Sequence, residues 1–181
     1  MNVVSSKLQT KAWRKAQSWY KGGKSNECEK YQKDQIRNLT GVDLVVRQGF
    51  RINKESYELC QIRNVDFKKL ENKFEYTEDF DCIHKIKDFD LFYNLKIVCE
   101  SGGAQTRCLN LVYYFIESQM QYLLHTDCKN KYFINILDGD TSYKSMKYFQ
   151  YLLNKEKYKS VNSYVFVGDM YEFQKWLDKN L

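Results

Sequence analysis

The segment 77–107 contains acidic residues, a lysine in an apolar run and a Gly-Gly loop, in a chain that is otherwise basic. Two runs of alternating apolar residues, 80–86 and 91–99, are separated by the polar turn 87–90 and predict a β-hairpin. Asp81 then lies at the start of the first strand and Lys96 midway along the second. A carboxylate and an amine on neighbouring strands are what an enzyme needs to hold a divalent metal ion against a phosphodiester and to orient the attacking water.

Helices and single strands alternate after this hairpin. Apolar spacing of three and four residues predicts helices over 6–20, 25–39, 105–124, 142–153 and 170–181, with Ser25 as the cap of the second. Further strands are predicted over 42–47, 131–137 and 163–167, while 50–60 is either extended or helical. We therefore expect an α/β fold, a mixed sheet in which an antiparallel hairpin joins parallel strands, flanked by helices on both faces.

Length and composition favour a single domain. The 181 residues are 43% hydrophobic and 16% aromatic, which is enough for a sizeable core. No repeat or low-complexity linker divides the chain, so 1–181 is interpreted as one domain with a basic helical region at 1–40. No run of eighteen apolar residues occurs and the N-terminus is charged, so we expect a soluble, cytoplasmic protein without a membrane segment.

The six cysteines and two histidines form no recognisable metal or catalytic motif. No CxxC pair is present, so a structural zinc site is not indicated. His84 and His125 lie far apart, and neither has a Ser or Cys nucleophile signature nearby, so a catalytic triad is not indicated either. We expect reduced, buried thiols.

The formal net charge of +6 suits a polyanionic partner without requiring one. Its distribution is more informative, because every charged residue in 1–24 is Lys or Arg, whereas acids gather between Glu71 and Asp90. Lys11, Arg14 and Lys15 are therefore candidate phosphate contacts beside an acidic cluster that could hold metal. A solvated helix face next to a solvated hairpin explains the same charges equally well.

The loop after the hairpin has the composition of a nucleic-acid contact. Gly102 and Gly103 lead into a predicted helix, so they would expose backbone N–H groups at the positive end of that helix, where phosphate binds readily. Gln105 and Arg107 are the residue types that read adenine and guanine edges, and Thr106 could cap the helix or touch a phosphate. The same residues also make an ordinary turn and cap.

The order of elements, together with Asp81, the strand 93–96 and the loop 102–107, resembles the PD-(D/E)XK nuclease superfamily, and within it small type II restriction endonucleases. The resemblance implies that 1–181 is a single nuclease-like domain with its catalytic core at about 75–169, in the restriction-endonuclease-like order of helix, three strands, helix and strand. It also implies that Asp81 binds metal and that Lys96 positions or deprotonates water. Asn94 stands where the family has Asp or Glu.

That departure weakens the expected Mg²⁺ site, because a neutral amide oxygen binds a divalent cation more weakly than a carboxylate does. Glu100 is expected on the same strand face as Asn94 and Lys96 by two-residue alternation, so Asp81, Asn94 and Glu100 are the predicted metal ligands. The missing charge could instead come from acids beside Asp81 or on an early helix. These alternatives are Glu78, Asp79 and Glu29.

These features predict a Mg²⁺-dependent endonuclease that cuts double-stranded DNA, a type II restriction enzyme acting as a homodimer with one active site for each strand. Two alternatives remain open. Asn94 favours a non-catalytic nucleic-acid-binding domain with a degenerate nuclease fold. The strand ends at 138–140 and 168–169 favour a small α/β protein that binds a nucleotide or a partner protein.

Overall fold

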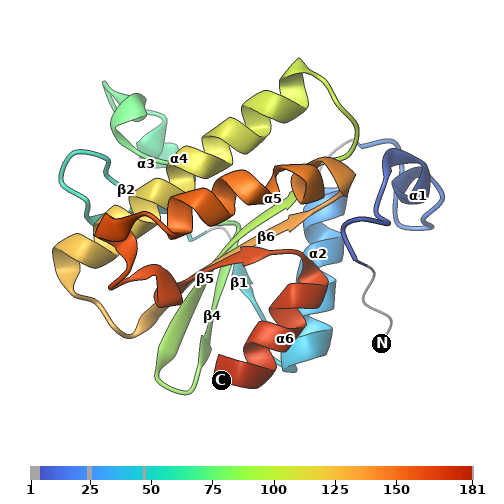
Figure 1. The fold of residues 1–181 in the computed structure, drawn as a ribbon. Helices are drawn as coiled ribbons and strands as arrows, with labels where there is room; N and C mark the ends of the chain where they lie inside the picture. Colours follow the sequence, from blue (N-terminus) through green and yellow to red (C-terminus); the bar gives the residue numbers. More distant parts are fainter. Residues whose placement is uncertain (1–4, 24–25, 47, 181) are drawn as a thin grey trace.

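A five-stranded mixed sheet lies between two layers of helices in the computed structural model, which describes residues 5–23, 26–46 and 48–180 (Figure 1). Across the sheet the order is β1 (Val45–Val46), β4 (Cys82–Ile86), β5 (Phe89–Ile97), β6 (Lys131–Asp138) and β7 (Val165–Gly168). β4 is antiparallel to both β1 and β5, whereas β5, β6 and β7 run parallel. The predicted α/β fold with a mixed sheet flanked by helices is confirmed.

Helices cover both faces of the sheet (Figure 1). The long ones are α2 (Glu27–Thr40), α4 (Gly103–Thr126), α5 (Asp140–Leu153) and α6 (Met170–Asn180). α2 and α6 pack on one face, where Ile36 shares an apolar core with Leu95 of β5. α4 and α5 pack side by side on the other face, where Phe149 shares a second core with Phe92 of β5. Alternation along β5 therefore supplies both cores.

The hairpin of β4 and β5 closes through a tight turn. Ile86 pairs with Phe89, and Lys87 between them has a φ of +52°, as the shortest hairpin turns require. The turn is therefore shorter than the predicted 87–90. At the other end the last pair is Cys82 with Tyr93, so Asp81 lies just outside the strand.

The boundaries of the long helices follow local capping. α2 is capped by Gly41, whose φ of +69° is left-handed, and it ends one residue beyond the predicted range 25–39. α4 ends at Asp127, which has a φ of +48° and donates its N–H to the carbonyl of Leu123. The predicted cap at Ser25 lies outside the described residues. No helix in the described part of the chain combines the length and apolar character needed to cross a bilayer.

The first helix is much shorter than predicted, because α1 spans Lys11–Lys15 instead of 6–20. Ser6 and Gln9 are only 1% exposed, and both bond to the end of the sheet. The Ser6 N–H donates to the Asp169 carboxylate at 3.0 Å, and the Gln9 carbonyl accepts an N–H from the start of α5 at 2.9 Å. These tertiary hydrogen bonds hold the segment in a non-helical path despite its helical spacing.

A small separate hairpin resolves the ambiguous stretch 50–60 as extended chain. It pairs β2 (Phe50–Ile52) with β3 (Leu59–Gln61). Arg51 of β2 is 7% exposed and lies 3.1 Å from the Asp79 carboxylate, so the hairpin is tied to the loop before β4. Short helices complete the described chain: α3 (Asn64–Phe67), η1 (Lys73–Glu75), η2 (Glu156–Tyr158) and η3 (Asn162–Tyr164).

Candidate active site

Asp81 and Lys96 meet where the β4–β5 ladder ends. The Asp81 N–H donates to the carbonyl of Tyr93 at 2.8 Å, which continues the ladder by one residue. Its side chain then turns onto β5, where Oδ2 accepts the N–H of Leu95 at 2.7 Å and lies 3.7 Å from Nζ of Lys96. The structure therefore brings together the two residues on which the sequence argument depends.

The charges of Asp81 and Lys96 are not equally well compensated by their surroundings. Burial raises the pKa of Asp81 to about 6, and the nearby Lys96 charge and the Leu95 N–H lower it only in part. Burial also lowers the pKa of Lys96, but the charges of Asp81 and Glu78 outweigh it, so that pKa is raised overall. At neutral pH Lys96 is charged, while the negative charge on Asp81 is incompletely compensated. A further cation beside Asp81 would therefore be favourable.

Glu29 of α2 lines two clefts, one of which reaches Asp81 and the other Lys96. One cleft of about 520 Å³ includes Asp81 in its lining, and a second of about 520 Å³ includes Lys96. Both are also lined by Asn26 and Glu29. The Glu29 charge raises the pKa of Asp81 further, which places the two carboxyl groups in one electrostatic environment. Lys33, one turn along α2, donates to the Glu29 carboxylate.

A row of cations on α2 lines the Asp81 cleft. These residues, which sequence reasoning did not single out, are Lys30, Lys33 and Arg37. Their spacing of three and four residues is the repeat of one helix face, so the signal was present in the sequence. A cleft with cations along one wall and carboxylates on the other suits a phosphate group held close to a metal ion.

The two acids beside Asp81 have different partners. Glu78 lies with its Oε2 3.6 Å from Nζ of Lys96, so it belongs to the same charged group as Asp81. Asp79 instead forms its ion pair with the buried Arg51. Of these two alternatives, the structure therefore brings only Glu78 into contact with Lys96.

Asn94 lies in a buried network of amides. It is 1% exposed, and its Nδ2 donates to Oδ1 of Asn135 at 3.0 Å. The same Oδ1 accepts Nε2 of Gln119 from α4 at 3.0 Å. Among the described residues, no hydrogen bond joins the Asn94 side chain to Asp81 or Lys96. The structure thus gives Asn94 a role in fixing α4 against the sheet and does not bring it to the expected metal position.

Glu100 is also not brought to the pair. Its carboxylate bonds to Nζ of Lys11 at 2.8 Å, and no ion pair in the described chain links it to Asp81 or Lys96. The alternation that placed Glu100 beside Lys96 ends with β5 at Ile97, and Glu100 itself has a φ of +68°. The backbone therefore turns before the expected face is reached.

The donor set near Asp81 is small. In the ranges that the structure describes, no three His, Cys, Asp or Glu side chains are arranged to hold a metal ion. Asp81 and Glu29 still supply two carboxylates, and Mg²⁺ commonly binds through one or two carboxylates, with waters and substrate phosphates completing its shell. Asp81 and Glu29 line one cleft, and two carboxylates match the number that Mg²⁺ takes from a protein when it is bound together with a phosphate.

One of the three predicted DNA contacts of the N-terminal region, Arg14, reaches the Lys96 cleft. Arg14 lines that cleft and lies 5.2 Å from the centre of the Tyr20 ring. Lys15 is exposed, whereas Lys11 is neutralised by Glu100. Of these three predicted contacts, Arg14 and Lys15 remain best placed to meet a phosphate.

The loop before α4 is an ordinary helix start with glycine caps. Gly102 is the N-cap, and Thr106 donates its hydroxyl to the Gly102 carbonyl at 3.1 Å instead of capping the helix. Nε of the exposed Arg107 lies 3.3 Å from the carbonyl of Gly103. Gln105 is half-buried. The start of α4 therefore presents Arg107 at the surface.

The strand ends at Asp138 and Asp169 are covered by the N-terminal segment. Asp138 is fully buried and accepts hydrogen bonds from Ser6, from Gln32 at 2.8 Å and from the N–H of Met170. Burial raises its pKa to about 6. Because Ser6 and its neighbours occupy this edge, the structure gives no support to a nucleotide site there.

Comparison of the chain with protein-family models, with curated proteins and with solved structures finds no match. The geometry of Asp81, Lys96 and the α2 residues around them is therefore the basis for a proposed function.

Proposed function

We propose that the protein is a Mg²⁺-dependent endonuclease that hydrolyses phosphodiester bonds of double-stranded DNA. The observation that carries the proposal is the 3.7 Å approach of Lys96 Nζ to Asp81 Oδ2, beside a cleft lined by α2 cations. A poorly compensated carboxylate next to a charged amine suits the binding of a metal ion and a phosphate at one place.

The order of elements supports a restriction-endonuclease-like core. Helix α2, strands β1, β4 and β5, helix α4 and strand β6 occur in this order along the chain, with the β2–β3 hairpin, α3 and η1 inserted between β1 and β4. This is the order of helix, three strands, helix and strand implied by the resemblance to the PD-(D/E)XK nucleases. Asp81 precedes the second of these three strands, and Lys96 lies on the third.

Each residue has a distinct role in this proposal. Asp81 and Glu29 would hold Mg²⁺, which when bound neutralises charge on the scissile phosphate and lowers the pKa of water. Lys96 orients the attacking water or stabilises the developing negative charge on the phosphate. The exposed Lys30 of α2 contacts the DNA backbone from the wall of the cleft, whereas Lys33 holds the Glu29 carboxylate in place.

Site-specific cutting as a type II enzyme is the finer part of the proposal. Arg107 and Gln105 are the residues proposed to read bases, while Arg14 and Lys15 add phosphate contacts. A homodimer would place one active site on each strand of a symmetric sequence. Phosphate contacts of this kind make affinity fall steeply as salt rises.

A second candidate is a duplex-DNA-binding domain that does not cut. The buried Asn94 favours it, because the position that carries an acid in the resembled family is held in an amide network here. Binding of duplex DNA without cleavage, in both Mg²⁺ and Mn²⁺, would support this candidate over the nuclease.

The test compares two lysines with similar partners. Lys96→Ala and Asp81→Ala should each reduce plasmid cleavage by about a hundredfold or more, while duplex affinity measured in Ca²⁺ changes little. Lys131→Ala is the matched control, because Lys131 lies 3.9 Å from the Asp90 carboxylate at the opposite end of β5 and β6. Unreduced cleavage by the Lys96 variant, or an equal loss in the Lys131 variant, would refute the assignment.

A further inference from the structure

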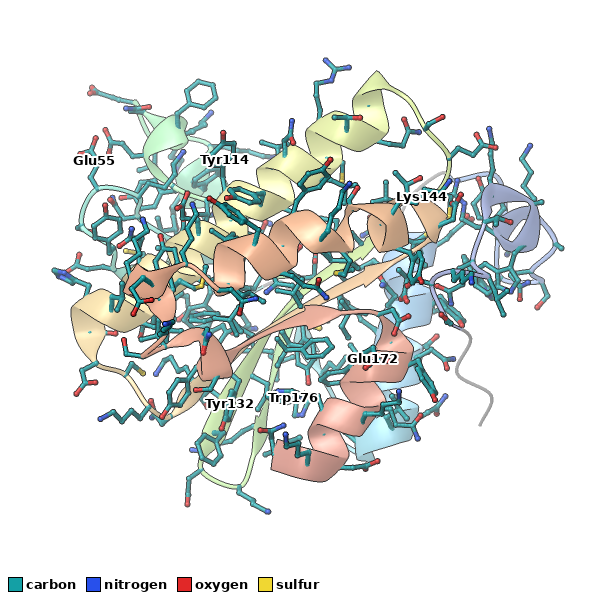
Figure 2. All side chains as sticks on the ribbon, viewed as in Figure 1. Glu55, Tyr114, Tyr132, Lys144, Glu172 and Trp176 are labelled. Carbon is teal, nitrogen blue, oxygen red and sulfur yellow. The ribbon has the colours of Figure 1, made fainter. Side chains whose placement is uncertain are left out.

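A groove between α4 and α5 is walled by tyrosines. It has a volume of about 500 Å³ and is lined by Thr106, Asn110, Tyr113, Tyr114, Tyr148 and Tyr151. Tyr114, Tyr148 and Tyr151 are 64%, 58% and 69% exposed. Figure 2 shows Tyr114 on α4, which packs beside α5. Three largely exposed rings at one groove are more aromatic surface than helix packing requires.

Helix geometry explains why these rings converge. Tyr148 and Tyr151 are three residues apart on α5, and Asn110, Tyr113 and Tyr114 are three and four residues apart on α4, so each set lies on one helix face. The half-buried Tyr113 packs with its ring centre 6.4 Å from that of Phe149, which belongs to the apolar core. Tyr113 therefore forms the floor of the groove, and the exposed rings form its rim.

Lysines are interleaved with the aromatic faces. Nζ of Lys155 lies 5.8 Å from the ring centre of Tyr113 and 5.9 Å from that of Tyr151. Nζ of Lys147 lies 5.1 Å from the ring centre of Tyr148. Residues 140–159 carry five lysines and two carboxylates, so the α5 side of the groove is positively charged. Glu117 of α4 compensates this charge in part, because it is paired with Lys155 at 3.6 Å.

We propose that this groove binds single-stranded nucleic acid. Exposed bases would stack on the rings of Tyr114, Tyr148 and Tyr151, and the phosphates between them would meet Lys147 and Lys155. Stacked aromatic side chains beside a cationic track are the features by which proteins hold single strands without reading their sequence. Thr106 and Asn110 at one end of the groove offer hydroxyl and amide groups to base edges.

The lysines of the groove favour a single strand over two other ligands that could cover its aromatic surface, a second copy of the chain and a proline-rich peptide. A second copy of the chain would bring its own lysines against these lysines, which is unfavourable. A proline-rich peptide would use the rings but would leave the lysines without a partner. A polyanion with flat apolar bases satisfies both features at once.

The experiment measures binding of fluorescent oligo(dT) and oligo(U), each of about 16 nucleotides, to the full chain in EDTA. Without metal no cleavage interferes, so the result is independent of the proposed nuclease activity. Tyr114→Ala, Tyr148→Ala and Tyr151→Ala should each weaken single-strand binding by about fivefold or more. Tyr148→Phe, which keeps the ring, should bind as the unaltered chain does. The tighter of the two oligomers identifies the preferred strand as DNA or RNA.

Tyr171→Ala is the matched control. Tyr171 lies on α6, is 42% exposed and has Nζ of Lys175 4.1 Å from its ring centre, so it repeats the tyrosine–lysine pair outside the groove. Circular dichroism shows whether each variant is folded. The proposal fails if the unaltered chain does not bind either oligomer, or if Tyr171→Ala loses as much affinity as the groove variants. Concentration-dependent self-association or proline-rich peptide binding that needs the same rings, without single-strand binding, would equally overturn it.

Discussion

The ammonium of Lys96 lies 3.7 Å from Oδ2 of Asp81, and yet the pKa of the Asp81 carboxyl rises to about 6. Burial and the neighbouring Glu29 charge disfavour the carboxylate more than Lys96 and the Leu95 N–H favour it. An ionised Asp81 therefore lowers the stability of the folded chain. In the proposed nuclease, a bound metal ion would relieve this cost.

Asp81→Asn should raise the free energy of unfolding at pH 8. The folded carboxyl has the higher pKa, so the folded state binds more protons than the unfolded state between the ordinary pKa of 3.8 and about 6. Stability due to this group therefore falls as pH rises through that window. The neutral amide escapes the loss, and we expect a gain of about 1–3 kcal/mol at pH 8 that disappears below pH 4.

Urea unfolding at a series of pH values measures this difference. Asp43→Asn is the control, because the Asp43 side chain is fully exposed and pairs with Arg37 at 3.8 Å, and an ion pair at the surface contributes little to stability. A gain in the Asp81 variant that stayed constant from pH 4 to pH 8 would mean that ionisation is not its cause.

Local sequence patterns were sufficient for the hairpin and for the meeting of Asp81 with Lys96. Alternation fixed the faces of β4 and β5, and the three- and four-residue apolar spacing fixed α4, because both patterns depend on residues close together in the chain. The parallel order of β5, β6 and β7 followed from single strands that alternate with helices.

Contacts distant in sequence determined what could not be predicted. The helical spacing of 6–20 was overridden because Ser6 bonds to the carboxylates of Asp138 and Asp169, which are more than 130 residues away. Glu100 was misplaced because β5 ends at Ile97, before alternation reaches it. The amide network of Asn94 depends on Gln119 and Asn135, which no local pattern connects.

Asn94→Asp tests whether the acid of the resembled family fits in this chain. The new carboxylate would face Oδ1 of Asn135, an acceptor, in a site that is 1% exposed. We expect the free energy of unfolding to fall by about 2–4 kcal/mol at pH 8, because a buried charge is left without a partner. Part of this loss should be recovered at acid pH, where the introduced carboxyl is protonated. Cleavage should not increase.

Asn130→Asp is the control for the chemical change itself. Asn130 is exposed in the loop before β6, and we expect a change below about 0.5 kcal/mol there. Higher cleavage with unchanged stability in the Asn94 variant would show that this side chain reaches the metal after all.

Gly139→Ala should damage the end of the sheet that supports the candidate site. Gly139 has a φ of +104°, and an added Cβ would lie 2.2 Å from the carbonyl oxygen of Val98. That carbonyl accepts the N–H of Thr141 at 3.2 Å, so the backbone after β5 cannot move without breaking its bond to α5. Strain and overlap together should cost about 2–4 kcal/mol.

Gly103→Ala is the matched comparison, since its Cβ would meet nothing within 4 Å at the first residue of α4. There the substitution should stabilise the chain by up to about 1 kcal/mol, because alanine loses less backbone entropy than glycine in a helix. Thermal unfolding of both variants measures the contrast, and equal midpoints would show that the Gly139 turn is not the constraint that the geometry indicates.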